Sequence, residues 1–155
     1  MAAPETSGAR LHPVRRVVRI AATVVVLVGI GLVVFWPMPP HPSEGGPYRQ
    51  VLEFLWDHGL PRWFTFMTAE FCANIALFVP FGMVAYWWKP STVRDTMLGF
   101  AASCLIEAAQ GAFVGGRVAD PRDIASNTIG ALVGSVIAAI AVRFAARRRK
   151  LASRA

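Results

Sequence analysis

The chain is organised around one stretch, residues 103–134, which reads SCLIEAAQGAFVGGRVADPRDIASNTIGALVG. This stretch sets charged and amide side chains directly beside long apolar runs. Ionisable groups are costly inside a membrane, and they usually mark a functional site or pair with one another. The polar members are Glu107, Gln110, Arg117, Asp120, Asp123 and Asn127. We therefore expect an integral membrane protein with a clustered polar site.

The composition fits a small membrane domain better than a soluble one. Of the 155 residues, 55% are hydrophobic and 16% are charged, and the mean hydropathy is +0.47. The formal net charge is +7, but the Lys and Arg residues flank apolar runs, which argues against nucleic-acid binding. Cys72 and Cys104 lie in apolar segments without the spacing of metal ligands or a disulfide framework. We expect two buried hydrophobes there, and no metal site or cofactor.

Hydropathy predicts an all-α, polytopic membrane helical bundle with four transmembrane helices. The predicted spans cover about residues 17–36, 64–88, 97–114 and 124–146, near the ~20 residues that a spanning helix needs. The transmembrane domain is residues 20–146. Two basic tails flank it, residues 1–19, expected to be disordered up to the bilayer, and residues 147–155. The first apolar run ends in Trp36-Pro37 without a small-residue cleavage site, which favours an uncleaved anchor over a signal peptide.

Short polar segments join the predicted spans. Residues 48–56 place Val51, Leu52 and Leu55 at helical spacing opposite polar side chains, which predicts a short amphipathic helix at the membrane surface. Residues 89–96 read as a polar hairpin between the second and third spans.

Two sequence features predict how the spans pack. Gly130 and Gly134 have the four-residue spacing that lets helices approach closely, so we expect the last span to pack through them. In the second span, Pro80 removes a backbone donor and Gly82 leaves space beside it. A kink or a widened turn is expected there.

The distribution of cations indicates that both termini are cytoplasmic. Twelve of the 16 Lys and Arg residues lie in the N-terminal tail, in the loop after the second span and at the C-terminal end from Arg143 onward, whereas the first and third loops hold four. Loops rich in Lys and Arg stay on the cytoplasmic side. We therefore expect a multi-pass protein of the plasma membrane, in contact with the lipid bilayer on its outer faces.

With this orientation, the polar residues meet in the outer half of the membrane. Each of the last three spans carries a polar pair that shares one helix face. The pairs are Glu70 with Asn74, Glu107 with Gln110, and Asp123 with Asn127. Arg117 and Asp120, on the loop between the last two spans, can reach the same space.

Within this cluster, Arg117 is the best candidate partner for Glu107, and Asp123 taken alone is expected to cap the last helix. The groups could instead only satisfy one another, as a network that fixes the register of the bundle. We favour a pocket facing the outer surface, because functional roles are the usual reason for charges at this depth.

Three motifs in the second half of the chain resemble the VanZ-like family of small bacterial membrane proteins. They are Asn74-x-x-Leu77-Phe78-x-Pro80-Phe81-Gly82, Ile106-Glu107-x-x-Gln110, and Arg117-x-x-Asp120-x-x-Asp123-Ile124-x-x-Asn127-Thr128-x-Gly130. The match covers roughly residues 71–134, and Ala125 and Ser126 depart from the bulkier residues usual there. The resemblance implies a polytopic helical protein of the cell envelope, in a family named after a member associated with resistance to the glycopeptide antibiotic teicoplanin. It implies no established reaction.

Three functions remain open at this point. The first is non-enzymatic: the outer pocket binds a lipid-linked or glycopeptide-like envelope ligand, or a partner protein, with Arg117 meeting an anionic group. The second is an intramembrane enzyme acting on a lipid-linked envelope precursor, with Glu107 or Asp123 as general acid or base, Arg117 steadying negative charge, and Gln110 and Asn127 orienting the substrate. The third is a small transporter or channel.

The residues favour the first of these functions. Ser103 and Cys104 lie one turn deeper than Glu107, and no His lies in the spans, so a nucleophile with an adjacent base is not visible. A continuous polar route is also missing from the inner half of the last two spans, and only an oligomer could complete one.

Overall fold

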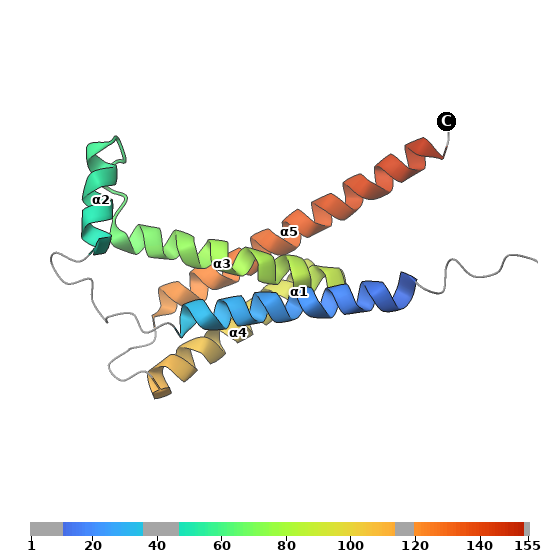
Figure 1. Ribbon diagram of the computed structural model, residues 1–155, viewed down its shortest axis with the longest axis horizontal. Helices are drawn as coiled ribbons and strands as arrows, with labels where there is room; N and C mark the ends of the chain where they lie inside the picture. The colour runs from blue at the N-terminus through green and yellow to red at the C-terminus, as the bar shows by residue number, and fades with distance from the viewer. Residues whose placement is uncertain (1–10, 36–46, 114–119, 154–155) are drawn as a thin grey trace, which may run out of the picture.

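The computed structural model describes residues 11–35, 47–113 and 120–153, and this part of the chain is helical without a strand. The helices are α1 (Leu11–Val34), α2 (Pro47–Asp57), α3 (Phe66–Trp88), α4 (Thr92–Phe113) and α5 (Pro121–Ala152). Figure 1 shows α1, α3, α4 and α5 gathered along one long axis, with α2 standing across the end at which α3 begins. The predicted all-α class is confirmed, and the short helix expected at residues 48–56 is present as α2.

Three of these helices are long and apolar enough to cross a membrane. They are residues Pro13–Val34, Phe66–Trp88 and Pro121–Ala152. Large apolar side chains such as Val25, Leu32 and Phe144 are exposed on them, as they are where a helix faces lipid. The predicted third span corresponds to α4, which is not one of the three. The four-span count and the cytoplasmic position of both termini therefore stay predictions.

The ends of three helices differ from the sequence prediction. The expectation of disorder up to residue 19 was wrong for residues 11–19, because α1 begins at Leu11 and accommodates Pro13 in its first turn, where a proline costs no intrahelical hydrogen bond. The polar hairpin of residues 89–96 was too long, because α4 already begins at Thr92. At the other end of the chain, α5 continues through the predicted basic tail to Ala152.

The backbones of α3 and α5 approach each other closely along a seam of glycines, which confirms the predicted role of the glycine pair. A Cβ atom on Gly134 would lie 1.9 Å from the backbone oxygen of Val79, and one on Gly130 would lie 2.3 Å from that of Ile75. From the other side, a Cβ on Gly82 would lie 2.0 Å from the backbone oxygen of Ala131. Only glycine allows the two backbones this close.

The backbone of α3 continues as an α-helix through Pro80. The widened turn that we considered there is not formed. The alternative, a kink at Pro80, stays a prediction.

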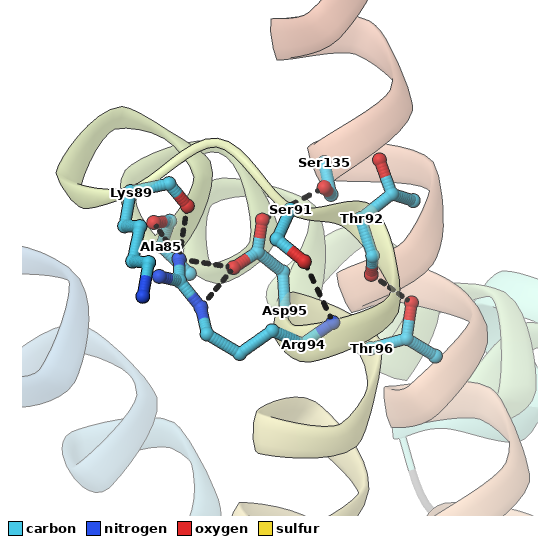
Figure 2. A network of polar contacts seen from close by, with 8 residues as sticks. All are labelled: Ala85, Lys89, Ser91, Thr92, Arg94, Asp95, Thr96 and Ser135. Atoms are coloured by element: carbon cyan, nitrogen blue, oxygen red, sulfur yellow. Dashed lines mark hydrogen bonds and ion pairs between the residues drawn. The ribbon is translucent and has the colours of Figure 1, made fainter.

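A buried polar network fixes the start of α4 against α3 and α5 (Figure 2). Asp95 is fully buried, and its carboxylate lies 2.6 Å from the Arg94 guanidinium and accepts the Ser135 hydroxyl at 2.9 Å. The same guanidinium donates to the backbone oxygens of Ala85, at 2.8 Å, and Lys89. This network was not predicted, because Asp95 lies among the residues that were interpreted as a polar hairpin.

Candidate functional site

A pocket of about 530 Å³ opens between the helices at the end where α3 begins. Most of its wall is apolar, and α1 and α2 contribute only aliphatic side chains: Val33 and Val34 from α1, and Val51, Leu52 and Leu55 from α2. Six of the eight predicted cluster residues also line the pocket, from α3, α4 and α5. They are Glu70, Asn74, Glu107, Gln110, Asp123 and Asn127. The structure thus brings the three predicted polar helix faces together on one cavity.

Asp123 joins α5 to α3 instead of capping its own helix. Its Oδ1 accepts a hydrogen bond of 2.8 Å from the side-chain amide of Asn74. The cap of α5 is Asp120, whose side chain accepts the backbone N–H of Arg122 at 2.8 Å, with Pro121 at the first helical position. The prediction that Asp123 is the cap was therefore wrong, although an acidic residue followed by proline is itself a helix-start signal.

Glu107 is buried on α4, with 6% of its surface exposed, and contacts the start of α5. Its Oε2 accepts the backbone N–H of Asp120 at 2.9 Å. This bond satisfies a donor at the N-terminal end of α5, where the helix dipole also favours a negative group. Arg117, the predicted partner of Glu107, lies outside the described residues.

The side-chain amide of Asn127 is hydrogen-bonded through its nitrogen but not through its oxygen. Its Nδ2 donates to the Ser103 hydroxyl at 2.9 Å, and Ser103 in turn lies 3.4 Å from the backbone oxygen of Asp123. The amide oxygen Oδ1 is buried and has no hydrogen-bond partner among the described residues. Asn127 also lines the pocket, so this unpartnered acceptor belongs to a residue of the pocket wall.

Gln110 attaches α1 to the polar side of the pocket. It is buried, and its Nε2 donates to the backbone oxygen of Val34 at 2.9 Å, satisfying one of the carbonyls left over at the end of α1. Glu70 lies on the wall as well, one turn before Asn74 on α3, and is exposed.

The position of α2 over the pocket is set by two contacts of one tryptophan. Trp56 donates from its indole nitrogen to the backbone oxygen of Phe64 at 2.9 Å, and the Arg62 guanidinium lies 5.6 Å from its ring centroid. These contacts turn the chain back between α2 and α3. The aliphatic side of α2 therefore faces the cavity instead of pointing away from the bundle.

The side chains of the site offer hydrogen bonding more readily than metal coordination. In the described part of the chain, no three His, Cys, Asp or Glu residues gather as metal ligands would. Cys72 is exposed on α3 and Cys104 is half-buried on α4, both as free thiols. Cys72 therefore does not fit the prediction of a buried hydrophobe.

Three helices of this molecule are long and apolar enough to cross a membrane, and the helices surround a cavity that is lined partly by polar side chains. The molecule is therefore a helical membrane protein. The chain belongs to the VanZ/LLP1 family, whose model matches residues 20–142. This confirms the resemblance seen in the sequence motifs and extends it over the first helix. Searches of curated proteins and of solved structures gave no significant match.

Proposed function

We propose that the pocket binds an amphiphilic ligand of the cell envelope, lipid-linked or glycopeptide-like, without changing it chemically. The lining of the pocket combines apolar and polar side chains, which supports a ligand with an apolar part and a polar part. Aliphatic side chains of α1 and α2 suit a hydrocarbon segment, and the amides and carboxylates of α3, α4 and α5 suit a polar group.

The observation that carries this proposal is the unpartnered oxygen of Asn127. A buried carbonyl without a partner costs about 1–3 kcal/mol, and a ligand that donates a hydrogen bond to it recovers that cost. The ligand is therefore a donor at this point, through a hydroxyl or an amide N–H. Sugars and peptides carry such groups.

Three neighbouring contacts hold the polar side ready for a ligand. Asn74 fixes the carboxylate of Asp123, the Asp120 amide fixes that of Glu107, and Ser103 fixes the amide of Asn127. Side chains that are already oriented lose little conformational entropy on binding.

The charge distribution and the family support a setting for this site at the outer face of the membrane. With the basic ends of the chain in the cytoplasm, the pocket opens at the outer face of the plasma membrane. A protein there meets lipid-linked envelope molecules and glycopeptide antibiotics directly. We therefore propose that binding in this pocket alters the susceptibility of the cell to teicoplanin.

The test is ligand-dependent stabilisation of the purified chain in detergent, with teicoplanin and a polyprenyl-linked disaccharide peptide as the two probes. We expect at least one probe to raise the melting temperature of the wild type. Asn127→Leu, which keeps the size of the side chain but removes the acceptor, should abolish that rise. Thr128→Val is the matched control, because Thr128 is the next residue on α5, does not line the pocket and bonds only to its own helix at Ile124.

Two results would contradict the proposal. One is a melting temperature that neither probe changes. The other is a probe-induced rise that Asn127→Leu and Thr128→Val retain equally, because the ligand would then bind elsewhere.

A further inference from the structure

We propose that the opposite end of the bundle holds a second site, which binds the phosphate group of an anionic phospholipid. A pocket of about 880 Å³ lies there between the start of α1, the end of α3 and the end of α5. In Figure 1, these ends lie on the side away from α2, where α1 and α5 diverge. This site is separate from the pocket that contains Asn127 and shares no residue with it.

The charge of this second pocket points to an anion. Four basic residues line it, Arg15 and Arg19 from α1 and Arg149 and Lys150 from α5, and its described lining contains no Asp or Glu. The dipole of α5 favours Arg149 and Lys150 in its last turn. Arg15 and Arg19 lie toward the N-terminal end of α1, where the dipole of that helix is positive and disfavours cations. Gathering four like charges is unfavourable unless an anion accompanies them.

Arg19 is held in place and keeps a donor available. Its guanidinium carbon lies 5.6 Å from the centroid of the Trp87 ring, within the range of a cation–π contact. Its Nε atom is buried and has no hydrogen-bond partner among the described residues. An arginine oriented in this way, with an unused N–H, fits the oxygen of a phosphate.

A chain of hydrogen bonds fixes the backbone around Arg19. Trp88 donates from its indole nitrogen to the Thr23 hydroxyl at 2.9 Å, and Thr23 donates to the backbone oxygen of Arg19 at 2.7 Å. These two bonds attach α1 to the last turn of α3. The basic side of α1 therefore faces the end of α5 at a fixed position, and the site is built by the fold and not by a loose tail.

The remaining walls identify the anion as a lipid and not a soluble ion. Trp87 and Trp88 bring amphipathic rings of the kind that lie at the headgroup level, and Val142, Ala145 and Ala146 continue an apolar surface along α5. Below a bound phosphate, an acyl chain can follow that surface into the bilayer. Basic pockets between membrane helices commonly bind anionic headgroups in this way.

The experiment titrates the full-length chain in neutral detergent with phosphatidylglycerol and follows the bound lipid by native mass spectrometry. Phosphatidylcholine and inorganic phosphate are the comparison ligands. We expect the wild type to bind phosphatidylglycerol in preference to phosphatidylcholine, and inorganic phosphate not to displace it.

Two double variants with the same net charge locate the binding. Arg15→Gln with Arg149→Gln removes cations from the pocket, and the affinity should fall roughly 30-fold, since each cation contributes a factor of about five. Arg16→Gln with Arg148→Gln removes the same charge from neighbouring exposed positions that do not line the pocket. This control should bind nearly as well as the wild type.

Several outcomes would overturn the proposal. Equal binding of both lipids by the wild type would remove the headgroup preference, and equal losses in both double variants would reduce the effect to general surface charge. Displacement by inorganic phosphate would make the ligand a soluble anion. If the pocket double variant does not fold, the single variants Arg15→Gln and Arg16→Gln give the same comparison at exposed positions. Equal losses in these two variants would overturn the proposal in the same way.

Discussion

Asn74 of α3 and Asp123 of α5 are joined by a hydrogen bond of 2.8 Å although 49 residues separate them in the chain. The bond lies on the wall of the pocket, and the same two helices also meet at the glycine seam. One contact therefore serves both the packing of the bundle and the orientation of a carboxylate. Stability and ligand binding have to be measured separately at this site.

Asn74→Ala and Asp123→Ala should each lower the free energy of unfolding, and the double variant should lose less than the sum. A hydrogen bond to a charged group contributes about 1.5–3 kcal/mol, and this is the expected coupling between the two residues. Reversible unfolding in mixed micelles measures it, with the exposed Cys72→Ala on α3 as the control. Strictly additive losses would show that the two side chains do not interact.

Gly134→Ala should lower the melting temperature markedly, because the new methyl group meets the backbone of α3 at 1.9 Å and overpacking typically costs about 1–3 kcal/mol. Gly31→Ala is the matched control. A Cβ at Gly31 has nothing within 4 Å, so this change should leave the stability unchanged or raise it slightly. Equal melting temperatures for the two variants would place the close approach of the helices elsewhere.

Asp95→Ala should destabilise the bundle by about 3 kcal/mol. It breaks a buried ion pair and leaves the Ser135 hydroxyl unpaired, while the partial exposure of Arg94 moderates the cost. The comparison is Glu53→Ala, which breaks the exposed pair of Arg49 and Glu53 and should cost less than about 1 kcal/mol. If the two losses were alike, the network around Asp95 would not fix the start of α4.

Structural features that depend on a short periodic pattern were predicted correctly from the sequence. Glycines four residues apart predicted the seam of α5, and polar pairs three or four apart predicted which side chains would share a face on each helix. Six of these side chains do line one cavity. The aliphatic spacing at residues 48–56 predicted α2 in the same way.

What the sequence did not show were contacts made at long range or decided by tertiary packing. Ser135 and Asp95 lie 40 residues apart, and Asp95 falls within the residues that were interpreted as a polar hairpin. Asp120 and Asp123 both had the chemistry of a cap. The signal that distinguishes them is Pro121, which suits the first helical position and so makes the preceding residue the cap.

Reporter fusions should test the predicted membrane topology. A reporter after Trp56 should read as outside, and one after Ser91 as inside, because the basic ends of the chain indicate a cytoplasmic N-terminus. A reporter after Ser153 decides whether α4 spans the membrane. If α4 crosses, this reporter also reads inside, and an outside reading would mean three spans and contradict the four-helix topology.

The most direct test of the proposed ligand site is to fill its cavity. Ala73 and Ala76 of α3 are both exposed, but Ala73 lines the pocket and Ala76, one turn further on, does not. Ala73→Trp and Ala76→Trp therefore add the same bulk inside and outside the cavity. The measurement is the dissociation constant of whichever probe stabilises the wild type, teicoplanin or the polyprenyl-linked disaccharide peptide. We expect Ala73→Trp to fold without binding the probe and Ala76→Trp to bind as the wild type does. Unchanged binding by a folded Ala73→Trp protein would rule out this pocket as the ligand site.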